Sequence, residues 1–130
     1  MTQEQKDLLL KDLCARLPYE VKVESMFINP DTKAHKSCGI EVFDATSILM
    51  IRDGLGEFKP YLFPFSSMTK EQRCELHDLI HNLNVLAING EIGDWIVSSS
   101  EIDWYNKNHF DYRGLIEKGL ALDATGLNIY

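Results

Sequence analysis

The sequence predicts a single α+β domain with an N-terminal helix, a small antiparallel sheet of three or four strands, and two or three C-terminal helices. Its 130 residues suffice for one hydrophobic core, and 45% hydrophobic with 25% charged residues is ordinary for a globular chain. The apolar spacing changes from helical to alternating near residue 21 and back to helical near residue 69. No repeat or long linker divides residues 1–130, so we expect one domain.

The first helix is expected over residues 2–17. Thr2 and Gln5 have the spacing of a capping box, and Pro18 ends the helical pattern. Five apolar side chains fall within one arc of about 140° and predict the buried face: Leu9, Leu10, Leu13, Cys14 and Leu17. Three charged residues lie outside this arc: Lys11, Asp12 and Arg16. Cys14 is therefore expected in the core.

Residues 21–63 are expected to form the sheet, as short strands of the kind that build an SH3-like half-barrel. Val21 and Val23 alternate with charged residues, and the apolar run at 48–51 is typical of a more buried strand. Turn signals separate the pieces at residues 29–31, 44–47 and 53–56. Pro60 and Pro64 place the last strand at an edge of the sheet or where the sheet ends.

A second helix is expected to begin after Thr69, whose spacing to Gln72 is another capping box. It should end near Leu83 or Leu86. Its apolar face consists of Met68, Leu76, Leu79, Ile80, Leu83 and Leu86.

A third helix is expected from Ser100, with Asp103 completing its cap, to about Asn108. Asp111 could cap a short fourth helix that ends at Gly119.

The net charge of −7 is concentrated in one segment. Residues 1–74 carry ten Lys or Arg and eleven Asp or Glu, and residues 106–130 carry three of each kind. The excess lies between Arg73 and Lys107, in Glu75, Asp78, Glu91, Asp94, Glu101 and Asp103. This segment repels phosphate, which disfavours nucleic-acid binding through it.

Compartment and membrane association follow from the cysteines and the apolar runs. Cys14, Cys38 and Cys74 are odd in number and far apart, which indicates reduced thiols in a cytoplasm. No apolar run approaches the ~20 residues of a membrane span, and the first ten residues are charged and amphipathic, unlike a signal peptide.

Three stretches carry a resemblance to a known group of proteins: residues 12–19, 59–69 and 103–122. Together they resemble an uncharacterised family of small proteins that is common in gut anaerobic bacteria and their phages. The resemblance implies an accessory protein of a phage or mobile element in a bacterial cytoplasm. It supplies no catalytic residues.

The preferred functional hypothesis is a non-enzymatic interaction or adaptor protein with a basic partner. It places the binding surface at the acidic and aromatic residues Glu91, Asp94, Trp95, Glu101, Trp104 and Tyr105. Two carboxylates beside aromatic rings are also typical of a cleft that cleaves sugars. The positions of the carboxylates in the sequence do not give the distance between them in space. The two tryptophans also fit core or interface anchors.

The first alternative is a small metal-binding protein or metal-dependent hydrolase. Cys74, His77 and His81 share one helix face within about 60° of arc, opposite the apolar stripe, and could hold zinc or copper. His77 to His81 also echo the HExxH protease motif, with Asp78 in place of Glu. A solvated helix face explains the same residues.

A second alternative is a weak nucleic-acid binder that uses the sheet. Its cations would be Lys22, Lys33, Lys36, Arg52 and Lys59, but acidic residues match them in number. Arg113 could grip a carboxylate or phosphate, within a helix-to-helix corner where Phe110 and Tyr112 pack. No strong catalytic constellation emerges from the sequence, so we expect a protein that is not an enzyme.

Overall fold

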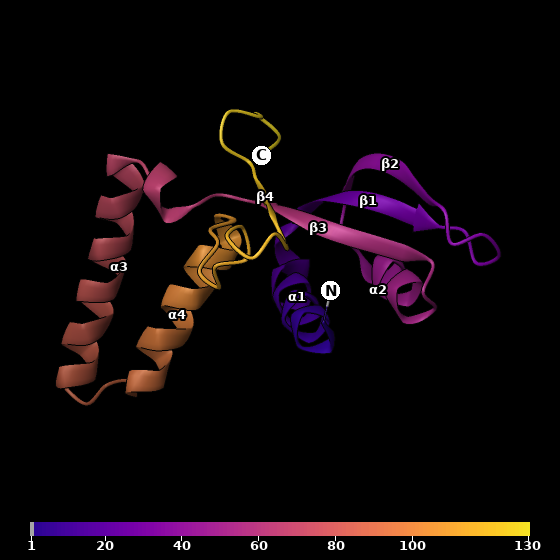
Figure 1. Cartoon of the computed structure of the whole chain (residues 1–130). Coiled ribbons are helices and arrows are strands. Elements are labelled where there is room, and N and C mark those ends of the chain that lie inside the picture. Colours follow the sequence, from indigo (N-terminus) through magenta and orange to yellow (C-terminus); the bar gives the residue numbers. More distant parts are fainter. Residues whose placement is uncertain (1) are drawn as a thin grey trace.

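The computed structural model describes residues 2–130 and combines helices with one four-stranded sheet (Figure 1). The α-helices are α1 (Gln3–Arg16), α2 (Ala45–Arg52), α3 (Lys70–Ile88) and α4 (Asp94–Lys107). The strands are β1 (Lys22–Ile28), β2 (His35–Val42), β3 (Gly56–Leu62) and β4 (Leu122–Asp123). Single turns of 3-10 helix lie at Leu17–Tyr19 and Phe65–Ser67. The expected α+β class is confirmed.

The sheet has the strand order β2-β1-β3-β4 and is mixed. β1 pairs antiparallel with both β2 and β3. The short turn after β1 predicts the pair with β2, whereas β2 and α2 separate β1 from β3 in the sequence. β4 pairs in parallel with the end of β3, at Tyr61 and Leu62. Pro60 lies just before this pairing begins, in the part of β3 whose outer side carries no strand, where its missing N–H breaks no ladder.

The core lies between the sheet and helices α1 and α2, which cover the same face of it (Figure 1). Val23 of β1 and Phe58 of β3 point into this layer, and the ring of Phe58 meets that of Phe43 edge-on at 5.8 Å. The buried apolar cluster is Leu9, Leu13, Val21, Val23, Phe43, Phe58, Leu62, Leu115, Leu120 and Ala121. Residues 115–121 therefore close the core from the far end of the chain.

The strand expected at residues 48–51 is wrong, because this run belongs to α2. Asp44 accepts a hydrogen bond from the backbone N–H of Ser47 at 3.1 Å, and the Ser47 hydroxyl receives one from the backbone of Asp44. This capping box starts a helix where the turn was expected. The periodicity of a four-residue apolar run is compatible with both a strand and a helix, and here the capping box favours the helix.

The expected buried face of α1 is also wrong in part. Cys14 is exposed, whereas Asp12 and Arg16, outside the expected arc, are completely buried. The buried face is rotated toward this charged pair, although Leu9 and Leu13 remain in the core. The Thr2 capping box is confirmed.

The C-terminal helices differ from the expectation in their boundaries. The Thr69 capping box starts α3 as expected, but α4 begins at Asp94, so Ser100 lies inside the helix and does not cap it. Residues 111–119 form turns where a fourth helix was expected. Asp111 still acts as a cap, since its carboxylate accepts from the backbone N–H groups of Leu115 and Ile116 at 2.8 and 2.9 Å.

Candidate functional site

Helices α3 and α4 form a hairpin that projects away from the sheet (Figure 1). α3 packs chiefly on α4, and α4 in turn touches α1. No residue of α3 is buried, although it is the longest helix at 19 residues. A helix with one packed side leaves most of its surface to solvent or to a partner.

The two helices of the hairpin meet along the apolar stripe expected for α3. Leu76, Leu79, Ile80 and Leu83 are half-buried. At the base of the hairpin the indole N–H of Trp104 donates to the Glu75 carboxylate at 3.1 Å. α3 is thus packed along its apolar stripe only, and its opposite face is exposed.

Large apolar side chains are exposed at the free end of the hairpin, around the turn at residues 89–93. Ile88 ends α3 with 85% of its surface exposed, and Trp95 near the start of α4 is 72% exposed. Val85 and Leu86 add to this end, at 44% and 37%. Single exposed apolar residues are normal, but several large exposed apolar side chains at the free end of one projecting element are typical of a contact surface.

The Trp95 ring packs closely on Gly93, in the turn that joins the two helices. A Cβ atom added to Gly93 would lie 2.8 Å from the Cδ1 and Nε1 atoms of the Trp95 ring, closer than atoms can approach. The glycine therefore lets the indole fold back over the backbone. Glu91 and Asp94, both exposed, precede Trp95 in the sequence.

The six residues of the expected acidic aromatic surface do not all share this exposure. Glu91, Asp94 and Trp95 lie at the tip. Trp104 is buried and stacks on Phe110, with ring centroids 5.6 Å apart and planes only 6° from parallel. It is a packing residue.

Tyr105 and Glu101 are engaged with each other lower on the hairpin. The Tyr105 hydroxyl donates to the Glu101 carboxylate at 2.7 Å. Burial of the ring, reinforced by the hydrogen bond and charge of Glu101, raises the pKa of Tyr105 to about 12. The tyrosine ring also contacts those of Phe65 and Tyr112, at centroid distances of 5.1 and 5.7 Å. This pair stabilises the base of the hairpin and is less available to a partner than the tip is.

Sequence reasoning missed Val85 and Ile88. Both follow His77 and His81 along the outer face of α3, at the 3- and 4-residue spacing of one helix side. Their position opposite the apolar stripe was readable from the same helical arithmetic that located the histidines. The outer face is therefore polar at its base and apolar at the tip.

Cys74, His77 and His81 are all exposed on that face, as expected. The two imidazole rings are nearly parallel, with centroids 6.2 Å apart. Across residues 2–130, no group of three or more His, Cys, Asp or Glu side chains is arranged to hold a metal ion.

The cations proposed for nucleic-acid binding are dispersed or paired. Arg52 lies on α2 and pairs with Asp53 at 3.0 Å, while Lys22 donates to the backbone carbonyl of Ile129. Lys59 stands opposite Glu24 across the β1–β3 pair. Of the two further cations, Lys33 lies in the loop between β1 and β2, and Lys36 lies in β2.

Arg113 does grip a carboxylate, but one within the chain. Its Nε donates to one oxygen of Asp12 at 3.1 Å, and Nε of Arg16 donates to the other at 2.9 Å. Arg16 also donates to the carbonyl of Phe110 at 2.6 Å. This buried network ties α1 to the segment after α4 and so anchors the base of the hairpin.

None of the helices in the described part of the chain is long and apolar enough to cross a membrane. Searches of protein-family models, of curated proteins and of solved structures gave no match to this chain.

Proposed function

We propose that this chain is a non-enzymatic interaction protein that binds a protein partner through the tip of the α3–α4 hairpin. We define the tip surface as Val85, Ile88, Glu91, Asp94 and Trp95. The observation that carries the proposal is the exposure of Ile88 and Trp95, at 85% and 72%, at the free end of a projecting element. Full burial of an apolar side chain of this size contributes about 1.5–3 kcal/mol.

The charge of the tip favours a partner that offers Lys or Arg beside apolar side chains. Glu91 and Asp94 have no cation near them in the sequence, since no Lys or Arg occurs between Arg73 and Lys107. A second copy of the chain would bring the same carboxylates face to face, and like charges across an interface disfavour association. A basic partner gains both from burial of the apolar side chains and from attraction to the carboxylates.

The wider setting is also part of the proposal. The three free, exposed cysteines suit a reducing cytoplasm, where such thiols persist. An adaptor of this size fits the phage or mobile-element accessory role that the sequence resemblance implies.

A site-specific photo-crosslinking experiment in a bacterial host tests the proposal. A photoreactive residue at position 88 should capture one defined protein in stoichiometric yield, whereas the same residue at exposed Leu49 on α2 should not. Trp95→Ser should abolish the capture, and Glu91→Lys with Asp94→Lys should weaken it about tenfold or more. Leu49→Ser is the matched control and should change nothing.

Two results would overturn the proposal. Capture that survives Trp95→Ser moves the interface away from the tip. A homodimer seen by sedimentation that Trp95→Ser converts to monomer would identify a second copy, not a basic partner, as the occupant.

A further inference from the structure

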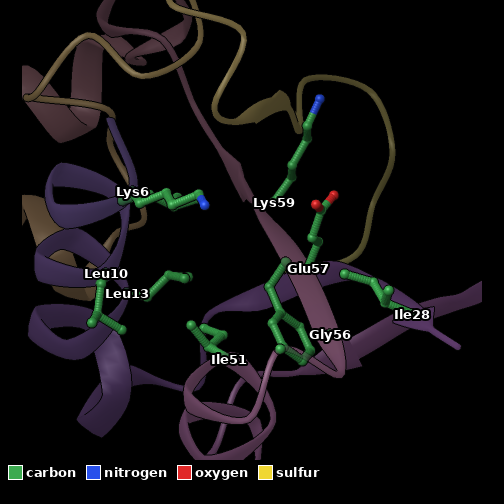
Figure 2. A pocket seen from close by; sticks show the side chains of 11 residues that line it. Lys6, Leu10, Leu13, Ile28, Ile51, Gly56, Glu57 and Lys59 are labelled. Atoms are coloured by element: carbon green, nitrogen blue, oxygen red, sulfur yellow. The ribbon is translucent and has the colours of Figure 1, made fainter. Parts of the chain in front are cut away.

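A separate apolar pocket lies at the opposite side of the molecule from the hairpin, between α1, β3 and the end of α2 (Figure 2). Its volume is about 210 Å³. Leu9, Leu13 and Phe58 form a buried floor, and half-buried Leu10 and Ile51 line the sides. The remaining lining residues are Lys6, Ile28, Gly54, Gly56, Glu57 and Lys59.

The pocket lies at the outer edge of β3, along the strand's first residues, whose other edge pairs with β1. β4 pairs only with Tyr61 and Leu62, so no strand among the described residues covers the outer edge of β3 near Gly56, which lines the pocket together with residues of α1. Gly56 keeps the wall flat, since an added Cβ would lie 3.0 Å from the Phe58 ring and 3.3 Å from the Met50 methyl group. Apolar walls of this kind favour an apolar occupant.

One cation is aimed at the pocket. Figure 2 shows the side chain of Lys6 reaching from α1 toward β3, whereas Glu57 and Lys59 point away from the gap. Lys6 forms no ion pair within residues 2–130. Lys59 forms no ion pair among these residues either, but its side chain points away, so Lys6 is the cation that extends toward a ligand in the pocket.

We propose that this pocket binds a small monocarboxylate with an aliphatic tail, with the tail between α1 and β3 and the carboxylate at the Lys6 ammonium group. The size sets the tail length. An apolar cavity of about 150 Å³ accepts benzene, so this pocket holds an apolar group of on the order of eight carbon atoms. It is smaller than the roughly 300 Å³ of typical drug-sized sites, which disfavours larger ligands.

Octanoate is the probe, and amide chemical shifts of the ¹⁵N-labelled full chain are the readout. Octanoate should shift the amides of Leu9, Leu13, Gly56 and Phe58 with a Kd of about 1 mM or tighter. The uncharged analogue 1-octanol should bind roughly fivefold more weakly, because it forgoes the ion pair.

Three variants separate the contributions. Lys6→Met should reduce octanoate affinity about fivefold and leave 1-octanol unaffected. Lys11→Met removes a charge from the same helix outside the pocket and should leave both affinities unchanged. Leu10→Phe should fill the pocket and abolish both, with the folded state checked by circular dichroism.

Several outcomes would overturn the inference. No pocket shifts at about 10 mM octanoate would exclude the site. Shifts that centre on Trp95 would indicate adsorption to the hairpin tip. If Lys6→Met and Lys11→Met weaken octanoate binding equally, the net charge of the protein explains the loss and Lys6 has no specific role. If octanoate and 1-octanol bind with equal affinity, the carboxylate is not recognised.

Discussion

Replacement of Asp12 by Asn should destabilise the protein severely while almost conserving the shape of the side chain. Asp12 and Arg16 are both fully buried and joined at 2.9 Å. The variant removes the negative charge and leaves the Arg16 guanidinium inside the protein without a counter-charge. One of its nitrogens, Nη1, already lacks a hydrogen-bond partner. Arg113 contributes less, because its side chain is 18% exposed and can turn toward water.

The expected loss is about 3–5 kcal/mol, the usual effect of leaving one member of a buried ion pair unpaired. Whole domains are stable by roughly 5–15 kcal/mol, so the variant should lie near the edge of folding. Urea denaturation followed by circular dichroism measures it. The midpoint should fall by at least ~1 M at unchanged slope.

Two further variants make the result interpretable. Asp53→Asn breaks an exposed pair with Arg52 and should leave the midpoint unchanged. Asp12→Leu combined with Arg16→Met replaces the buried charges by apolar groups and should recover at least half of the loss. The reasoning is refuted if Asp12→Asn costs less than about 1 kcal/mol, or if the double variant is no more stable than Asp12→Asn.

Three other predictions concern stability and the tip. Burial, with the charges of Arg16 and Lys22, lowers the pKa of His109 to about 4 from 6.5, so only the unfolded chain gains this proton between those values. The free energy of unfolding should therefore be fully retained above pH 6.5 and fall by about 1–2 kcal/mol as the pH drops to 4, a value that allows for solvent screening of the half-buried ring. In urea titrations, the free energy of unfolding of His109→Phe should depend less steeply on pH than that of the wild type. An identical dependence would contradict the role of His109. Asp44→Ala should cost about 1 kcal/mol by removing the cap of α2, and a thermal midpoint equal to wild type would count against that cap. Gly93→Ala should displace the Trp95 ring and shift its fluorescence with little loss of stability, whereas an unchanged spectrum would show that the ring does not pack on the glycine.

Much of the local structure could be predicted because its causes are local. The capping boxes at Thr2 and Thr69 start α1 and α3 as expected, and the Asp111 carboxylate caps the turn that follows it. Alternation across Val21 and Val23 identified β1. In each case the interacting groups lie within about five residues of one another, so short-range spacing carries the information.

The candidate site was predictable only in part. Glu91, Asp94 and Trp95 are exposed at the tip, while Trp104 is buried against Phe110. Each tryptophan directly follows an aspartate, so the residue before it does not tell the two apart. The difference arises because the C-terminal end of α4 meets the core and its N-terminal end does not.

By itself, the sequence determined the α+β class, the helix starts at Thr2 and Thr69, and the acidic segment between Arg73 and Lys107. The tertiary structure alone decided which side of α1 is buried. Leu9 and Leu13 could have shared the core with Cys14 by helical arithmetic, but Arg113 binds Asp12 across a sequence separation of 101 residues and turns the charged pair inward. Such long-range partners are set by chain topology, and no local pattern records them.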